Sequence, residues 1–284
     1  MPIGMVVGAL LCYPITTFDE WSGGISTPFF IFSMLFCTFC RVDIREMRPS
    51  WLHFWLMVAQ IVGTVAVYYI LLPLGDTVAQ GGMICALAPM AMGAMVIAGL
   101  LGAKIETMAT HSLICNVLTA FIAPPLLSMW GNGTCTINEI LLRVTPLLIS
   151  PFVVAQLCRW LTPKAAHWIG SHAMISFYLW LGSLVVIMGK TTHFIIESGT
   201  EHIRTEILLA VSALVICLVQ FALGHMLGSR YGDESAGGQA LGQKNTVLAI
   251  WLAQSFLNPL ACIAPTAYIV WQNLINSYQI YKHQ

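Results

Sequence analysis

Residues 242–252, which read Gly-Gln-Lys-Asn-Thr-Val-Leu-Ala-Ile-Trp-Leu, place a charged amine directly before an apolar run. The amine belongs to Lys244, in a chain that is 58% hydrophobic and only 8% charged. A charged side chain near the middle of a bilayer costs about 3 kcal/mol on insertion scales, so such residues usually face a protein interior or a water-filled path. Lys244 is therefore the first candidate site residue.

The composition excludes an ordinary soluble domain, because the mean hydropathy is +0.80. The formal net charge is zero, so no basic surface predicts a nucleic-acid partner. Most of the nine cysteines lie in or beside apolar segments, where packing explains them. Cys37 and Cys40 have the spacing of a zinc or redox pair, but there is no second pair, so we expect no metal and no cofactor.

The hydrophobic residues form about ten segments, given that a helix needs roughly 20 residues to cross a bilayer. The first segment is too short to cross alone. We predict an all-α polytopic membrane protein, a single transmembrane transporter domain over residues 1–284, with segments at 2–14, 25–40, 51–74, 80–102, 107–130, 138–160, 168–189, 204–229, 234–257 and 259–281.

Two segments are interrupted, and they occupy matching places as the fourth and the ninth. Pro89 and Gly93 break residues 80–102, while Gly237, Gly238 and Gly242 loosen residues 234–257. Matching breaks suggest two five-helix repeats, at about residues 1–130 and 138–284, inserted with opposite topology. This arrangement is typical of transporters whose site forms where two discontinuous helices meet.

Basic residues are concentrated in alternate loops, which sets the expected orientation. With the N- and C-termini cytoplasmic in a plasma (inner) membrane, the outside loops keep Lys190, Arg204 and marginally Arg143. The inside loops then hold Arg41, Arg45, Arg48, Lys104, Arg159, Lys164, Arg230 and Lys282.

The breaks predict a site of positive sign. Each break exposes amide hydrogens and a positive dipole end where its second half begins, near residues 91–95 and 245–248. Lys244 adds a full charge, and the Asp and Glu residues lie between the apolar segments or at their ends. The expected partner is a small organic anion. A structural role, in which Lys244 joins the carbonyl ends of the broken helices, stays open.

Polar residues also follow one face of the fifth segment. His111 and Cys115 are four residues apart, as are Ser112 and Asn116, so they form adjoining stripes. Such residues either join neighbouring helices or belong to the site, and both interpretations remain open.

The C-terminal fifty residues carry a family resemblance. Residues 242–245, then Asn258-Pro259, Ala264-Pro265, Tyr268 and residues 270–273 resemble the bile acid:sodium symporter family. The resemblance implies that segments 3–5 and 8–10 form a core that moves against a panel of segments 1, 2, 6 and 7. It also places a polar residue at Gln60.

The resemblance assigns sodium ligands to positions that have lost their oxygens. The family's ligands are an acid, a Gln, a Ser-Asn pair and two hydroxyls. Their counterparts here are Ala240, Lys244 in place of the Gln, Ala94 with Met95, Met108 and Ser112, of which only Ser112 keeps an oxygen. Sodium needs several hard oxygen ligands, as other hard cations do. We therefore expect a divergent, sodium-independent member in which the Lys244 amine stands in place of the ion.

The substrate residues are implied by the same resemblance. Asn245 would contact the anion at the start of the second half of the ninth segment, with Gln243, Lys244 and Asn273 beside it. Met92 and Met95 would shape the facing wall, although plain packing also explains methionine there.

We therefore expect an alternating-access secondary transporter of a small or amphipathic organic anion. Two alternatives remain: a proton-coupled carrier with Lys244 as the titrating group, since burial disfavours a charged amine, and a receptor that binds without translocating. The motifs of membrane-embedded enzymes, such as His-Glu-x-x-His or Gly-x-Ser-x-Gly, are missing from the sequence, so we do not expect an enzyme.

Overall fold

The computed structural model describes residues 2–42, 45, 47–131, 136–198 and 202–283. Over these ranges the regular structure is helical, and the only β-type pairing is one isolated antiparallel bridge between Met90 and Lys244. The expected all-α class is therefore confirmed for the described residues.

The chain forms two compact units. The first unit comprises residues 1–43 and 141–203, and the second comprises residues 44–140 and 204–284. The first unit contains the segments that the resemblance assigns to a panel, and the second those that it assigns to a core. That one unit moves against the other stays a prediction.

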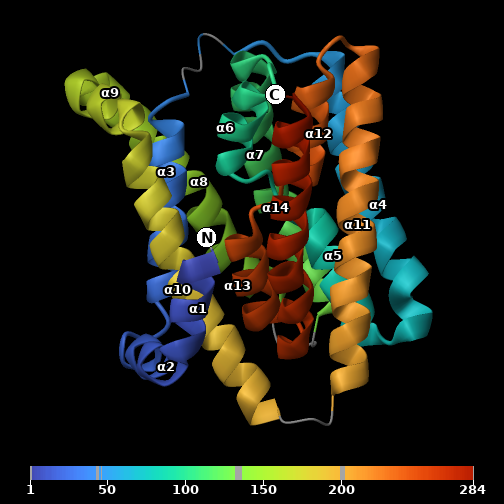
Figure 1. The fold of residues 1–284 in the computed structure, drawn as a ribbon. Helices are drawn as coiled ribbons and strands as arrows, with labels where there is room; N and C mark the ends of the chain where they lie inside the picture. The colour runs from blue at the N-terminus through green and yellow to red at the C-terminus, as the bar shows by residue number, and fades with distance from the viewer. Residues whose placement is uncertain (1, 43–44, 46, 132–135, 199–201, 284) are drawn as a thin grey trace. The chain divides into compact units, whose positions relative to one another are not determined.

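The first unit contains α1 (Pro2–Leu10), α2 (Cys12–Trp21), α3 (Ser26–Phe39), most of α8 (Ile137–Leu161), α9 (Pro163–Ser171) and α10 (Ala173–Ser198). Helix α1 lies against α10, and a Cβ added at Gly8 would lie 2.4 Å from the carbonyl oxygen of Val185 (Figure 1). Lys190 on α10 pairs with the buried Asp19 on α2 at 2.6 Å. These contacts hold the short N-terminal helices in place.

The first-unit boundaries differ from the expected segments. The segment predicted at 2–14 is two helices, because α1 ends at Leu10 and α2 continues to Trp21. Helices α2 and α3 meet at an angle of 87°, where Gly23 and Gly24 adopt positive φ values of 67° and 78°. Glycine makes this turn at no steric cost, since it lacks a Cβ.

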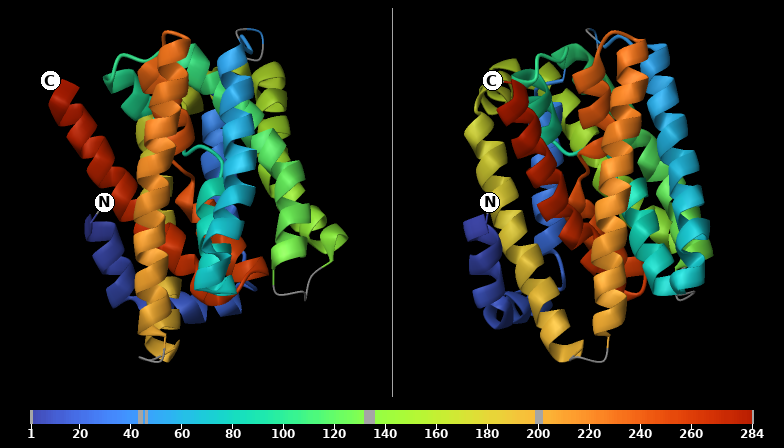
Figure 2. Two further views of the ribbon diagram at one scale, coloured as in Figure 1. Left: turned by 90° about the vertical axis from the view of Figure 1, so that its right-hand side faces the viewer. Right: turned by 45° about the vertical axis from the view of Figure 1, so that its right-hand side comes forward.

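The second unit contains the interrupted helices. Its elements are α4 (Trp51–Leu71), η2 (Leu72–Leu74), α5 (Asp76–Leu87), α6 (Gly93–Leu100), α7 (Ile105–Trp130), α11 (Ile203–Arg230), α12 (Glu234–Gly242), α13 (Thr246–Phe256), η3 (Pro259–Cys262) and α14 (Ile263–His283). Figure 2 shows α5 and α13 at one end of this unit, with α6 and α12 at the other. The breaks therefore lie at residues 88–92 and 243–245, where the sequence predicts them.

Close backbone contact joins α11 to α12. A Cβ at Gly224 would lie 2.3 Å from the carbonyl oxygen of Gly237, and one at Gly228 would lie 2.4 Å from that of Asp233. Only glycine permits this approach, so α12 is fixed along the C-terminal half of α11.

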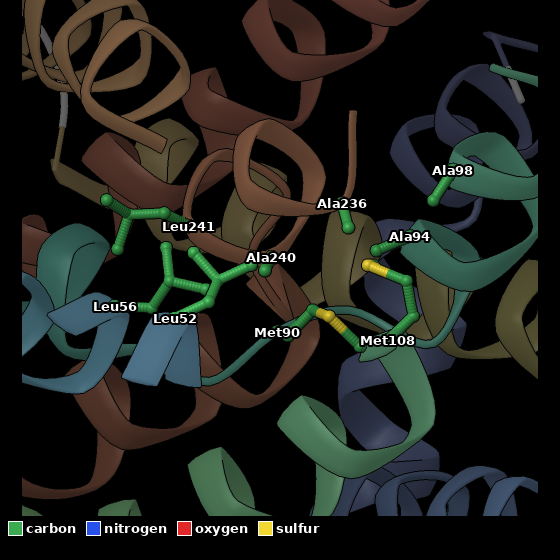
Figure 3. Packing of buried hydrophobic residues seen from close by; sticks show 9 residues of the cluster. All are labelled: Leu52, Leu56, Met90, Ala94, Ala98, Met108, Ala236, Ala240 and Leu241. Carbon is green, nitrogen blue, oxygen red and sulfur yellow. The ribbon is translucent and has the colours of Figure 1, made fainter. Parts of the chain in front are cut away.

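A buried apolar cluster surrounds one side of the breaks (Figure 3). It draws residues from α4, α6, α7, α12 and the first break, namely Leu52, Leu56, Met90, Ala94, Ala98, Met108, Ala236, Ala240 and Leu241. The small side chains of α6 and α12 allow these two short helices to pack closely.

Within the described ranges, five helices are long and apolar enough to cross a membrane, or six if the bent pair α2 and α3 counts as one span. The halves of each interrupted helix are too short for that criterion. The chain is thus a multi-pass membrane protein, while the ten-span inverted repeat and the cytoplasmic termini stay predictions.

Candidate functional site

The two breaks cross each other and satisfy each other's backbone. Asn245 N–H donates to the carbonyl oxygen of Pro89 at 2.8 Å, and Ala91 N–H donates to that of Gln243 at 2.9 Å. Buried backbone groups without partners are costly, and an unwound segment has lost its helical ones. The crossing replaces those lost bonds, so the two unwound segments stabilise one another.

Lys244 lies at the centre of this crossing and is 1% exposed. Its Nζ donates to the carbonyl oxygen of Ala86 at 3.0 Å, and its backbone N–H donates to Oε1 of Gln272 at 2.9 Å. Ala86 belongs to the last turn of α5, where unpaired carbonyls form the negative end of the helix dipole. The amine therefore occupies the kind of position that a bound cation prefers.

Neutral donors satisfy the neighbouring carbonyls. Gln60 Nε2 donates to the carbonyl oxygen of Leu87 at 2.8 Å, and Gln220 Nε2 donates to that of Ala86 at 3.5 Å. The hydroxyl of Tyr268 lies 2.8 Å from both Gln220 Oε1 and the carbonyl oxygen of Gly242, the last residue of α12. The carbonyl ends of both broken helices are thus bonded by buried side chains.

The amide ends of the second halves face the same crossing. Asn245 caps α13, since its Oδ1 accepts from the N–H of Leu248 at 3.2 Å. A Cβ at Gly93, the first residue of α6, would lie 3.2 Å from Nε2 of Gln243. Gln243 is 8% exposed, and its Oε1 has no partner among the described residues. Two positive dipole ends and a buried amide therefore lie beside the ammonium, which suits an anion.

Four of the six positions assigned to sodium ligands, Ala94, Met95, Met108 and Ala240, are apolar. Ala94, Met108 and Ala240 belong to the cluster of Figure 3, and Met95 packs against it. Ser112 is buried and is the only one of these residues with a side-chain hydroxyl. Alanine and methionine side chains offer no hard oxygen of the kind that sodium prefers.

Of the polar residues along one face of α7, some bond within the helix and others contact α4. Cys115 Sγ donates to Gln60 Oε1 at 3.3 Å, whereas Asn116 Nδ2 donates to the carbonyl oxygen of Ser112 in its own helix. His111 is fully buried and stacks against His53 at 6.1 Å between ring centroids. Neither nitrogen of His111 has a protein partner in the described part of the chain.

Within the described residues, neither Asn273 nor Met92 forms a side-chain hydrogen bond with Lys244. Asn273 Nδ2 donates to the carbonyl oxygen of Ile269 at 2.6 Å, within its own helix, and Met92 is half-buried. The neighbour of Asn273, Gln272, is the α14 residue that contacts Lys244. The roles of Asn273 and Met92 stay predictions.

Several buried polar residues were not among the expected site residues. They are Gln220, Gln239, Gln272 and Asn276, all at most 7% exposed. Gln272, Asn276 and Gln279 recur at helical spacing along α14, a signal that could have placed them on one face.

No group of three or more His, Cys, Asp or Glu side chains that could hold a metal ion occurs among residues 2–42, 45, 47–131, 136–198 and 202–283. The fold and the crossing define a polytopic helical membrane protein with a buried cationic centre. No curated protein matches the chain.

The sequence model of the SBF-like CPA transporter family matches residues 26–274, which is most of the chain. The protein therefore belongs to the SBF-like CPA transporter family. This relationship to the bile acid:sodium symporters confirms the expected family at that level and indicates a membrane transporter.

Proposed function

We propose that the protein is an alternating-access secondary transporter that carries a small or amphipathic organic anion without sodium, with the amine of Lys244 in place of the ion. The contact of Lys244 Nζ with the carbonyl oxygen of Ala86 carries this proposal. A cation at the carbonyl end of α5 is stabilised as a bound ion would be, but it cannot dissociate.

The charge of Lys244 supports an anionic substrate. Among the described residues, the amine of Lys244 bonds the carbonyl oxygen of Ala86, and no carboxylate is paired with it. A buried charge without a counter-charge is costly. A carboxylate on the substrate would supply that counter-charge, and the amide ends of α6 and α13 would orient it.

The apolar cluster supports the loss of sodium coupling. A sodium ion would have to displace the ammonium and then find oxygens among Ala94, Met108 and Ala240. These side chains also offer an apolar wall, which suits the hydrocarbon part of an amphipathic anion.

A thermal-shift screen of bile acids, keto acids and vitamin-like acids tests the substrate class. Wild type is compared with Lys244→Met, which removes the charge and keeps a long side chain, and with Lys164→Met, an exposed lysine on α9 as the matched control. We expect at least one anion to raise the Tm of wild type and of the control, but not of Lys244→Met. A ligand that stabilises all three proteins equally would contradict a role for the amine.

Counterflow in proteoliposomes separates a carrier from a receptor. A carrier preloaded with unlabelled ligand accumulates labelled ligand transiently above equilibrium, whereas a receptor does not. We expect the overshoot with the anion identified in the screen. Its absence in wild type, with binding intact, would contradict the transport proposal.

The buried amine also favours a second candidate, a carrier in which Lys244 itself binds and releases the coupling proton. Desolvation makes deprotonation of a buried amine easier. Transport rates measured between about pH 5 and 9 test this candidate, since a flat profile would argue against it.

A further inference from the structure

A chain of buried amides leads from the end of α11 toward the crossing. We define the amide chain as Gln279, Gln239 and Asn276, from α14 and α12, with His225 of α11 at its outer end. The side chain of His225 is 27% exposed, whereas Gln239 is fully buried and Asn276 is 4% exposed. The chain therefore joins a solvent-accessible imidazole to the interior of the second unit.

The hydrogen bonds of this chain set which atom of each amide is paired. The amide nitrogen of Gln279 can only donate, so the Nε2 of His225 that it contacts is the acceptor and the ring proton lies on Nδ1, which is 3.7 Å from Oε1 of Glu234. His225 Nε2 then accepts from Gln279 Nε2 at 2.9 Å. Gln239 Nε2 donates both to Gln279 Oε1 at 2.8 Å and to Asn276 Oδ1 at 2.9 Å. The orientation of each amide is thus tied to which nitrogen of His225 carries the proton.

Two buried polar atoms at the inner end of the amide chain lack hydrogen-bond partners among the described residues. They are Gln239 Oε1 and Asn276 Nδ2. Asn276 lies one helical turn from Gln272, whose Oε1 accepts from the backbone N–H of Lys244. A buried polar atom without a partner requires an explanation, and here a donor faces the interior near the site.

Protonation of His225 requires each side-chain amide of the amide chain to rotate. With both ring nitrogens protonated, Nε2–H would meet the Nε2–H of Gln279, so the Gln279 amide must rotate to present its oxygen. Gln239 then turns its oxygen to Gln279, and Asn276 turns its nitrogen to Gln239. The unpaired atom of Asn276 changes from the donor Nδ2 to the acceptor Oδ1.

We propose that His225 is a proton-binding site whose state sets, through the amide chain, whether Asn276 offers a donor or an acceptor to the bound ligand. With neutral His225, the donor suits a carboxylate. With protonated His225, the acceptor suits a hydroxyl or a protonated acid. The site therefore couples ligand protonation to the pH on the side where α11 ends.

The surroundings of His225 favour this role. Glu234 of α12 is the charged group paired with it, α14 contributes the uncharged Gln279, and Arg230, the nearest charged residue further along α11, is exposed. A Cβ at Gly238 would lie 2.6 Å from the ring, so the imidazole rests directly on the backbone of α12. The ring is thus held in position and can equilibrate with solvent.

Side-chain nuclear magnetic resonance of the full chain in nanodiscs tests the proposal without any ligand. Histidine, glutamine and asparagine are labelled with nitrogen-15, and pH is varied. In wild type, we expect the ring signals of His225 and the amide signal of Asn276 to change together as the pH is lowered. An Asn276 signal that does not move would overturn the proposal.

Three variants assign the cause. In His225→Gln the Asn276 signal should stay constant, and in Gln279→Leu His225 should still titrate while Asn276 does not follow. His193→Gln, which removes another histidine 3.5 Å from a glutamate but outside the chain, should behave as wild type. A pH-dependent Asn276 signal that persists in either of the first two variants would contradict the proposal, and the second decides if the first fails to fold.

Only the contact of Asn276 with ligand rests on the proposed function. If Lys244→Met keeps its ligand stabilisation while the Asn276 signal still follows His225, the transport proposal fails and the proton site stands. The converse result would leave the anion site intact and remove the proton site.

Discussion

Burial of the Lys244 amine destabilises the protein, and its contacts offset only part of that cost. Desolvating its amine costs several kcal/mol, and a single hydrogen bond to a charged donor recovers about 1.5 to 3 kcal/mol. The carbonyl end of α5, which bonds the amine through Ala86, adds a favourable dipole. The remaining cost is what an anionic ligand can relieve, so we expect ligand binding and protein stability to be linked at this position.

The substitution Lys244→Gln tests whether one residue determines the choice of cation. It restores the amide that the resemblance implies at this position, yet the neighbouring Ala94, Met108 and Ala240 still lack side-chain oxygens. We expect loss of ligand stabilisation without any gain of sodium dependence. Thermal unfolding in sodium and in choline buffers measures this, and a Tm raised specifically by sodium would contradict it.

Tyr268 provides a second prediction at the residue scale. The change Tyr268→Phe removes only the hydroxyl, and the buried carbonyl of Gly242 and Oε1 of Gln220 then lose a donor. We expect the free energy of unfolding to fall by about 1 to 3 kcal/mol. The control is Tyr278→Phe on the same helix, which is 64% exposed and should change little. Equal effects of the two changes in thermal denaturation would argue against the bonded network.

The sequence revealed Lys244 more readily than its partners. A lysine in an apolar segment stands out by charge, whereas Gln272 and Gln220 are neutral and give no such signal. Asn273 is the expected substrate residue on α14, a role that stays a prediction, whereas its neighbour Gln272 bonds the backbone N–H of Lys244. A shift of one residue turns a side chain by about 100° around a helix, which spacing alone does not resolve.

At the scale of elements, the breaks were predictable and their pairing was not. Pro89 removes a helical donor, and glycines loosen residues 234–257, so both interruptions could be read from the sequence. The antiparallel bridge between Met90 and Lys244 depends on how α5, α6, α12 and α13 pack. The sequence does not predict the division of residues 2–14 between α1 and α2, because the residue between the two helices is Leu11 rather than a helix-breaking Pro or Gly.

The contact between α11 and α12 gives a prediction for these elements. In Gly224→Ala the new methyl would lie 2.3 Å from a backbone oxygen of Gly237, so the two helices must separate. We expect a loss of about 1 to 3 kcal/mol in the free energy of unfolding. Gly63→Ala on α4 is the matched control, because nothing lies within 4 Å of its added Cβ, and it should be neutral or slightly stabilising. Similar melting of both variants would contradict the close contact.

At the scale of the whole molecule, hydropathy identified the class but not the number of spans. Five to six described helices satisfy length and composition. The halves of each interrupted helix are too short, and α14 is not among the candidate spans although it has 21 residues. The membrane class follows from composition and from family membership. The inverted repeat would have to be tested by mapping which loops face each side.

The most direct test of the account is uptake of the anion by purified protein in proteoliposomes, compared in sodium-free choline buffer and in sodium buffer. A tethered amine at the α5 carbonyl end makes a dissolved cation unnecessary. We predict equal rates in the two buffers. Strong stimulation by sodium would contradict the claim that Lys244 replaces the ion.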